Sequence, residues 1–144
     1  MKKIIRAAMV AGLLAAAGSQ AIQAQQAQRV VTFRVPFAFQ VEDTRLQAGE
    51  YTILEQAGWV QIQAKDGKGK MQVLTLPVTS RNQQTAEGSQ VVFHNYAGRL
   101  YLAQIWASGQ EKGRELLESK EEQQLAKREK MAAVNVPATS TSGK

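Results

Sequence analysis

The segment Val31-Thr-Phe-Arg-Val-Pro-Phe-Ala-Phe-Gln-Val41 decides the fold class of this chain. Its odd-numbered positions are all Val or Phe, whereas its even-numbered positions are Thr, Arg, Pro, Ala and Gln. Side chains of a β-strand point alternately to opposite faces, so this period of two predicts a strand with one apolar face. Because Pro36 has no N–H to donate to a ladder, we expect either an edge strand or two strand segments bent at Pro36.

A hairpin is predicted around Asp66-Gly67, which separates two alternating runs of apolar and polar residues. A loop centred there pairs Ile62 with Met71 and Val60 with Val73. Apolar residues then meet across the two strands, so the predicted register is self-consistent.

A second hairpin is predicted at the other end of the strand-forming region. A two-residue turn at Ala97-Gly98 sets Phe93 opposite Leu102 and His94 opposite Tyr101. One face of this pair is then core and the other is polar and aromatic. Together these segments predict an all-β domain, an antiparallel meander closed as a small barrel or as a sandwich.

The N-terminus carries the three regions of a bacterial secretory signal. Three basic residues flank an uncharged run at 7–17, and small residues lead up to cleavage sites after Ala21 or Ala24. The run is shorter than the ~20 residues of a spanning helix, so no transmembrane segment is expected after cleavage. We therefore expect an exported protein, periplasmic or extracellular, with a signal peptide at 1–24.

The amino-acid composition limits the partners and the kinds of functional site that the chain can have. The 144 residues include 18 Lys plus Arg and 12 Asp plus Glu, and three of the basic residues belong to the expected signal peptide. The remaining excess of positive charge is small, which does not favour a nucleic-acid partner. With no Cys and one His, the chain cannot form disulfides, a thiolate nucleophile or a Cys/His zinc cluster. Burial of a core alone must hold the domain together.

The amino-acid composition of the chain changes after Ser108. Residues 118–131 lack β-branched and aromatic side chains and are rich in Glu, Lys and Gln, which predicts a helix with a thin apolar stripe. The polar composition of the last residues predicts a disordered tail. The expected organisation is a signal peptide (1–24), an antiparallel β domain (25–108), a C-terminal turn and helix (109–133) and a disordered tail (134–144).

The candidate ligand-binding residues are aromatic, apart from the single imidazole. They are His94, Tyr96, Tyr101, Trp106 and Trp59. In a small barrel such aromatic residues either line an apolar ligand cavity or fill the core. His94 is either a general base beside a tyrosine or, the interpretation we favour, a strand-face histidine hydrogen-bonded to a neighbour. No catalytic residue is predicted. No metal site or cofactor is predicted either, since all other ligands of a lone His would have to be carboxylates.

These patterns favour a non-enzymatic, exported domain that binds a small apolar ligand or associates with an envelope protein. The alternative from a different class is a structural subunit that self-associates through the long first strand, because an exposed strand edge is a template for pairing. A small hydrolase-like enzyme is the third hypothesis, since candidate catalytic groups are sparse.

Five segments, in this order, resemble a family of small exported proteins from acidobacteria. They are Val35-Pro36-Phe37-Ala38-Phe39, Leu46-Gln47-Ala48-Gly49-Glu50-Tyr51-Thr52, Val92-Phe93-His94-Asn95-Tyr96, Leu102-Ala103-Gln104-Ile105-Trp106 and Gly113-Arg114-Glu115-Leu116. The resemblance covers residues 30–126, and Gln47 stands where many relatives have Pro. It implies export and a compact β fold. The family has no assigned activity, so the resemblance supplies no catalytic residues.

Overall fold

A computed structural model describes residues 29–67, 69–79 and 88–142 of the chain. The expected signal peptide lies outside the described residues. The elements are β1 (Arg29–Val35), β2 (Phe39–Val41), β3 (Thr44–Leu46), β4 (Gly49–Gln56), β5 (Trp59–Ala64), β6 (Lys70–Thr79), β7 (Ser89–Tyr96), β8 (Arg99–Trp106), β9 (Lys112–Leu116), α1 (Lys120–Arg128) and β10 (Met131–Ser142).

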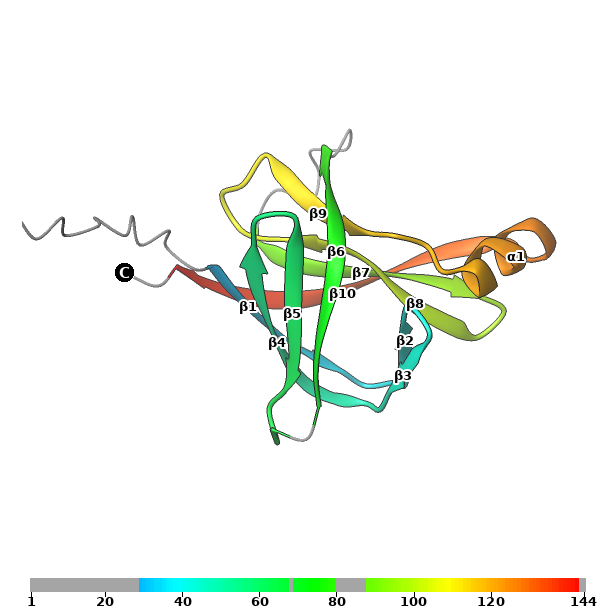
Figure 1. The fold of residues 1–144 in the computed structure, drawn as a ribbon, viewed down its shortest axis with the longest axis horizontal. Helices are drawn as coiled ribbons and strands as arrows, with labels where there is room; N and C mark the ends of the chain where they lie inside the picture. The colour runs from blue at the N-terminus through cyan, green and yellow to red at the C-terminus, as the bar shows by residue number, and fades with distance from the viewer. Residues whose placement is uncertain (1–28, 68, 80–87, 143–144) are drawn as a thin grey trace, which may run out of the picture.

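Eight of these strands form a closed antiparallel barrel (Figure 1). The strand order is β8-β7-β10-β1-β4-β5-β6-β9, and β9 pairs with β8 to complete the circle. The short β2–β3 hairpin is attached to β8 through a parallel pairing of β2. The all-β prediction is confirmed, with the barrel rather than the sandwich as its form. The meander is interrupted because β9 and β10 insert between strands that are earlier in the chain.

The first predicted strand is two strands. Its alternation is retained, because Val31, Phe33 and Val35 in β1 and Phe39 and Val41 in β2 are all buried. The chain bends between the two segments at residues 36–38, which confirms the second of the two alternatives.

The prediction of an edge strand is wrong. β1 pairs with β4 on one side and with β10 on the other, so it lies within the closed barrel wall. Pro36 follows the last residue of β1 and therefore removes no hydrogen bond from this ladder.

Aromatic rings fill the barrel interior. Phe39 packs edge-on against Phe93 and Tyr51, with ring centroids 5.2 Å apart in both pairs. Phe33 lies 6.5 Å from Phe39 and 6.4 Å from Phe93, measured between ring centroids. Because a barrel of eight strands is just wide enough for side chains to fill, these rings occupy much of its interior.

Both predicted hairpin registers are confirmed. Ile62 pairs with Met71 and Val60 with Val73 between β5 and β6. The same agreement holds between β7 and β8, where the turn residues Ala97 and Gly98 both adopt positive φ, as a tight two-residue hairpin turn requires.

A β-bulge alters the β7–β8 register away from the turn. Near the turn, Phe93 lies opposite Leu102, as predicted. Beyond the irregularity at Val92/Phe93, Val91 lies opposite Ile105, one position further than the turn alone specifies. Val91 and Ile105 are both fully buried. The bulge therefore keeps apolar residues facing inward along the whole length of β8.

The expected disordered tail is wrong for residues 134–142, which belong to β10. This strand pairs with β7 on one side and with β1 on the other. Val136 is buried, and Val134 and Ala138 are partly buried against the core, so the strand retains a period of two despite its polar composition. Residues 131–138 pair with β7 and residues 138–142 pair with β1, so the backbone of β10 has a partner strand along its whole length, which composition cannot reveal. Residues 143–144 lie outside the described part of the chain.

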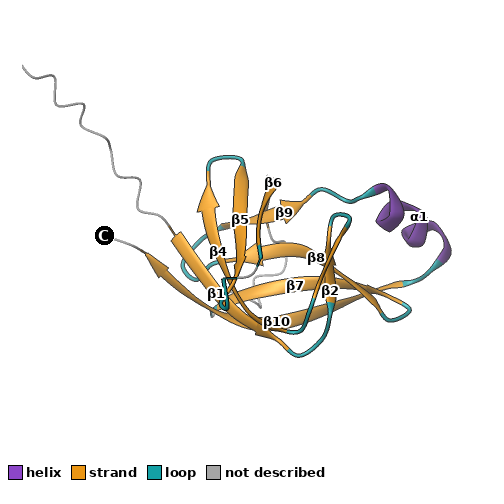
Figure 2. Cartoon of the chain, turned by 60° about the horizontal axis from the view of Figure 1, so that its bottom comes forward, coloured by secondary structure: helices purple, strands orange, loops and turns teal. Residues whose placement is uncertain are grey.

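The segment expected to be a turn and a helix contains both a strand and a helix. β9 closes the barrel between β6 and β8. The predicted helix is confirmed as α1, and its first turn is capped by Ser119, whose Oγ accepts a hydrogen bond from the backbone N–H of Glu122 at 3.1 Å. Figure 2 shows α1 outside one end of the barrel. No helix among the described residues is long and apolar enough to span a membrane.

Candidate functional site

Three of the five candidate ligand-binding residues come together on the outside of the barrel. His94 and Tyr101 are cross-strand partners on β7 and β8, and Tyr96 lies two residues along β7. Tyr96 and Tyr101 pack with Leu125 of α1 in an apolar cluster separate from the barrel core. These residues therefore hold the helix against the barrel wall.

The other two candidates lie elsewhere on the barrel. Trp59 is on β5, where its cross-strand partner is Leu74 of β6. Trp106 is at the end of β8, and its indole Nε1 donates to Gln104 Oε1 at 3.1 Å. Neither residue belongs to the interior cluster of the barrel. The five candidates thus do not line a common cavity.

The junction of α1 with β7 contains a buried carboxylate that the sequence reasoning missed. Glu122 is 5% exposed, and its Oε1 accepts a hydrogen bond from Tyr96 Oη at 3.1 Å. His94 Nδ1 lies 3.3 Å from the same oxygen and 3.4 Å from Tyr96 Oη. Because a buried carboxylate is costly without hydrogen-bond partners, these contacts make the docking of α1 specific.

The helix presents this carboxylate through simple spacing. Glu122 and Leu125 are the two buried residues of α1, and they are three positions apart, which places them on one face. Arg99 Nη1 also contacts Glu121 Oε1 at 3.2 Å, but both side chains are half exposed and the pair adds little stability. The composition of residues 118–131 predicted the helix but assigned no role to its acidic residues. The Ser119-x-x-Glu122 spacing typical of a helix start was the available signal.

The tyrosines of the chain hold their protons tightly. Burial raises the pKa of Tyr96 well above its usual range, and the adjacent Glu122 carboxylate raises that pKa further. Burial, followed by the charge of Glu121, raises the pKa of Tyr101, and burial also raises the pKa of Tyr51. At neutral pH the Tyr96 phenol is therefore a hydrogen-bond donor to the carboxylate and cannot serve as a base.

A further acidic residue completes a group of metal-ligand types at this junction. Glu118 lies just before α1, and its carboxylate, that of Glu122 and the imidazole of His94 each place a ligand atom within 4.8 Å of the others. The prediction that no metal site exists rested on the need for carboxylates beside the lone His. The fold brings two carboxylates to that position.

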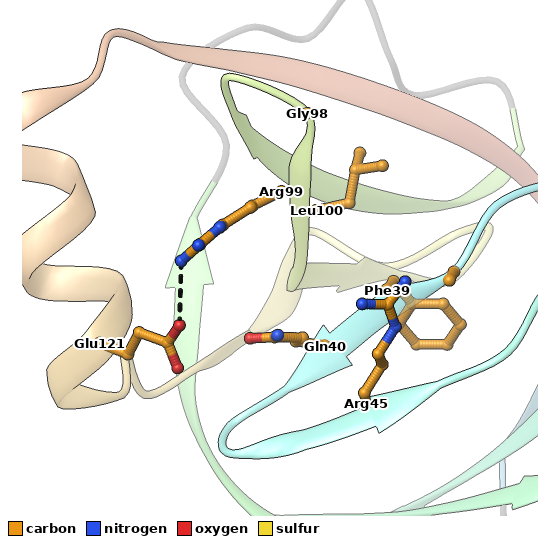
Figure 3. A pocket seen from close by; sticks show the side chains of 8 residues that line it. Phe39, Gln40, Arg45, Gly98, Arg99, Leu100 and Glu121 are labelled. Carbon is orange, nitrogen blue, oxygen red and sulfur yellow. Dashed lines mark hydrogen bonds and ion pairs between the residues drawn. The ribbon is translucent and has the colours of Figure 1, made fainter.

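A polar pocket of about 220 Å³ lies beside this junction, between the β2–β3 hairpin, the β7–β8 turn and α1. Figure 3 shows Arg99 and Glu121 joined across one side and Gln40 and Arg45 on the β2–β3 hairpin. Gln40 Oε1 is buried and has no hydrogen-bond partner among the described residues. Arg45 is exposed and forms no ion pair with another described residue.

The fold and the site define this protein as a closed eight-stranded antiparallel barrel with a helix docked on its outer face. Comparisons of the chain with protein-family models, curated proteins and solved structures found no match. Its function must therefore be argued from the chemistry of its own residues.

Proposed function

We propose that this protein is an exported, non-enzymatic binding domain whose ligand occupies the pocket lined by Gln40, Arg45, Arg99 and Glu121. The proposal rests on two neighbouring groups of the same hairpin: the buried Oε1 of Gln40, which has no hydrogen-bond partner among the described residues, and the exposed guanidinium of Arg45, which has no ion-pair partner among them. A buried acceptor without a partner costs about 1–3 kcal/mol, so a ligand that donates a hydrogen bond there gains free energy.

The chemistry of the pocket favours a small, hydroxylated anion such as an acidic sugar. A hydroxyl group supplies the donor that Gln40 Oε1 lacks, and a carboxylate pairs with the planar guanidinium of Arg45. The pocket is smaller than the roughly 300–1,000 Å³ typical of drug-sized ligands, which favours a single sugar-sized unit. This proposal replaces the apolar ligand expected from the sequence, because aromatic side chains occupy the barrel interior.

The predicted signal peptide supports export. N-terminal sequencing of the protein from the producing cell tests this part of the proposal. We expect a mature N-terminus at Ile22 or Gln25, and a cytoplasmic protein that retains Met1 contradicts export.

The position of β1 in the sheet does not favour the alternative hypothesis, which is self-association through the first strand. β1 has partners on both sides, whereas among the described strands the edge position belongs to the three-residue strand β3. A strand this short offers few backbone groups to a second chain. Sedimentation over a hundredfold range of concentration tests this alternative, and we expect a single monomeric species.

Titration with glucuronate and glucose tests the binding proposal, with backbone amide NMR shifts as the readout. The two sugars differ in the carboxylate, so glucuronate should bind more tightly and shift the amides of Gln40, Arg45 and Arg99. A charged hydrogen bond contributes about 1.5–3 kcal/mol, so Arg45→Ala should weaken glucuronate binding roughly 10–100-fold.

The matched control is Arg34→Ala, which removes another exposed arginine, on β1 and outside the pocket. This variant should bind glucuronate with unchanged affinity. Equal affinity for glucose and glucuronate, or equal losses in the two arginine variants, contradicts the proposed pocket.

A further inference from the structure

We propose that His94, Glu118 and Glu122 form a binding site for one divalent transition-metal ion at the junction of β7 and α1. Their ligand atoms lie within 4.8 Å of one another, although the residues come from a strand, from the segment before the helix and from the helix itself. This site is separate from the sugar pocket and does not depend on the function proposed for it.

The geometry of the buried pair suits coordination of one ion. Ligand bonds of about 2.0–2.1 Å place neighbouring donor atoms roughly 3.3–3.4 Å apart around a tetrahedral metal and roughly 2.8–3.0 Å apart around an octahedral one. The distance from His94 Nδ1 to Glu122 Oε1 is 3.3 Å. These two atoms are therefore already spaced as adjacent ligands. Glu118 is exposed, so its flexible side chain is free to adjust to the ion as the third ligand.

The negative charge of the three ligands favours binding of a cation. When they act as ligands, two carboxylates and an imidazole are deprotonated and together carry two negative charges, which a divalent ion neutralises. Neutralisation of charge matters most for Glu122, because its side chain is only 6% exposed and lies against an apolar cluster. The His94 side chain is 16% exposed, so solvent reaches the imidazole.

Tyr96 provides the outer support that metal ligands usually have. Its phenol donates a hydrogen bond to Glu122 Oε1 and fixes the orientation of that carboxylate. A carboxylate offers about four lone-pair positions on its two oxygens, so Glu122 can accept from Tyr96 and still bind an ion.

The donor set favours first-row transition metals over Ca²⁺ and Mg²⁺. Calcium and magnesium prefer oxygen ligands alone, whereas an imidazole nitrogen combined with carboxylates suits Zn²⁺, Mn²⁺ or Fe²⁺. A bound ion would connect the barrel wall to α1, since one ligand lies on β7 and the others lie on or next to the helix (Figure 1). The proposed role of the metal is to fasten the helix.

Calorimetric titration of the mature, tag-free protein with Zn²⁺ tests the site, with Ca²⁺ as the comparison ion. We expect one Zn²⁺ per chain, no Ca²⁺ binding at the same concentration, and a higher Tm in the presence of Zn²⁺. The chain has a single His, so the imidazole NMR signals report His94 without ambiguity. Zn²⁺ should shift these signals.

Glu118→Gln is the decisive variant, because Glu118 is exposed and the change should leave the fold intact. It should weaken Zn²⁺ affinity at least tenfold, as should His94→Ala. The matched control is Glu121→Gln, which removes a neighbouring carboxylate that contacts Arg99 instead. This control should bind Zn²⁺ with affinity unchanged within about twofold.

Two results overturn the proposal. One is the absence of Zn²⁺ binding with unshifted His94 signals, which leaves only a hydrogen-bonded pair between His94 and Glu122. The other is equal Zn²⁺ affinity in Glu118→Gln and Glu121→Gln. Failure of glucuronate binding would not affect either measurement, so the two proposals are tested independently.

Discussion

A charge placed inside β10 gives the sharpest test of the fold, because the composition of this segment predicts a disordered tail. Val136 is 7% exposed and pairs with Val91, which is fully buried. Its neighbour Asn135 is exposed on the opposite face of the same strand. The variants Val136→Asp and Asn135→Asp therefore introduce the same side chain at adjacent positions, one inside the barrel and one outside.

The expected losses differ by an order of magnitude. Replacing Val136 forfeits about 1.5–3 kcal/mol of apolar burial. An aspartate at this depth must also remain protonated at pH 7, about three units above its ordinary pKa, which costs about 4 kcal/mol at 1.36 kcal/mol per unit. The total of roughly 6–7 kcal/mol is a large part of the 5–15 kcal/mol that holds a small domain together. Asn135→Asp should change the free energy of unfolding by under ~0.5 kcal/mol.

Urea denaturation followed by tryptophan fluorescence and circular dichroism measures both variants. We expect Asn135→Asp to unfold at the wild-type midpoint and Val136→Asp to be largely unfolded without urea. A chain ending at Ala133 should likewise lose cooperative unfolding, since β1 and β7 both lose a strand partner. Equal midpoints for the two point variants, or a native spectrum for the shortened chain, would refute the placement of β10.

Three further predictions concern barrel closure, the tyrosines and a turn. Gly113→Ala should lower the free energy of unfolding by about 1–3 kcal/mol, because its new Cβ would lie 2.7 Å from Trp106 ring carbons and 2.9 Å from the Ile105 carbonyl oxygen. Urea denaturation measures this loss, and an unchanged midpoint contradicts the packing. All three tyrosines have raised pKa values, so the native protein should show less tyrosinate absorbance at pH 10 than the unfolded chain. The tyrosines of the unfolded chain ionise at lower pH than those of the native protein, so their contribution to the free energy of unfolding should be complete below about pH 10 and fall above it. Equal tyrosinate absorbance of the native and unfolded protein at pH 10 contradicts the burial. Ala97→Asn should raise the free energy of unfolding by up to about 1 kcal/mol, since Ala97 has a φ of 51°, a left-handed conformation that Asn tolerates better; a lower midpoint argues against this turn.

Local patterns in the sequence determined much of the barrel wall. The alternation from Val31 to Val41 identifies the inward-facing residues, and the turns at Asp66-Gly67 and Ala97-Gly98 set the registers of two hairpins. These features follow from residues close together in the chain, because strand periodicity and tight-turn conformation are local properties. The helix was likewise predictable from the composition of residues 118–131.

Long-range pairing was decided by the tertiary structure alone. The polar residues of β10 form a strand because β7 offers hydrogen-bonding groups to residues 131–138 and β1 offers them to residues 138–142, although both strands are far away in the sequence. Backbone pairing depends little on side-chain composition, so disorder was the wrong inference from composition. Barrel closure by β9 has the same origin, since β6 and β8 become its neighbours only in the folded state.

The candidate site depends on tertiary structure for the same reason. His94 and Glu122 are 28 residues apart and meet only when α1 docks on the outer face of β7. The sequence by itself determined that one imidazole lies on a strand face and that acidic residues start a helix. Only the packing of that helix, through Leu125 against Tyr96 and Tyr101, places the carboxylates beside the imidazole. Helix docking depends on the complementary shapes of the folded barrel surface and the helix surface. These shapes arise from residues that are far apart in the sequence, so no single segment predicts them.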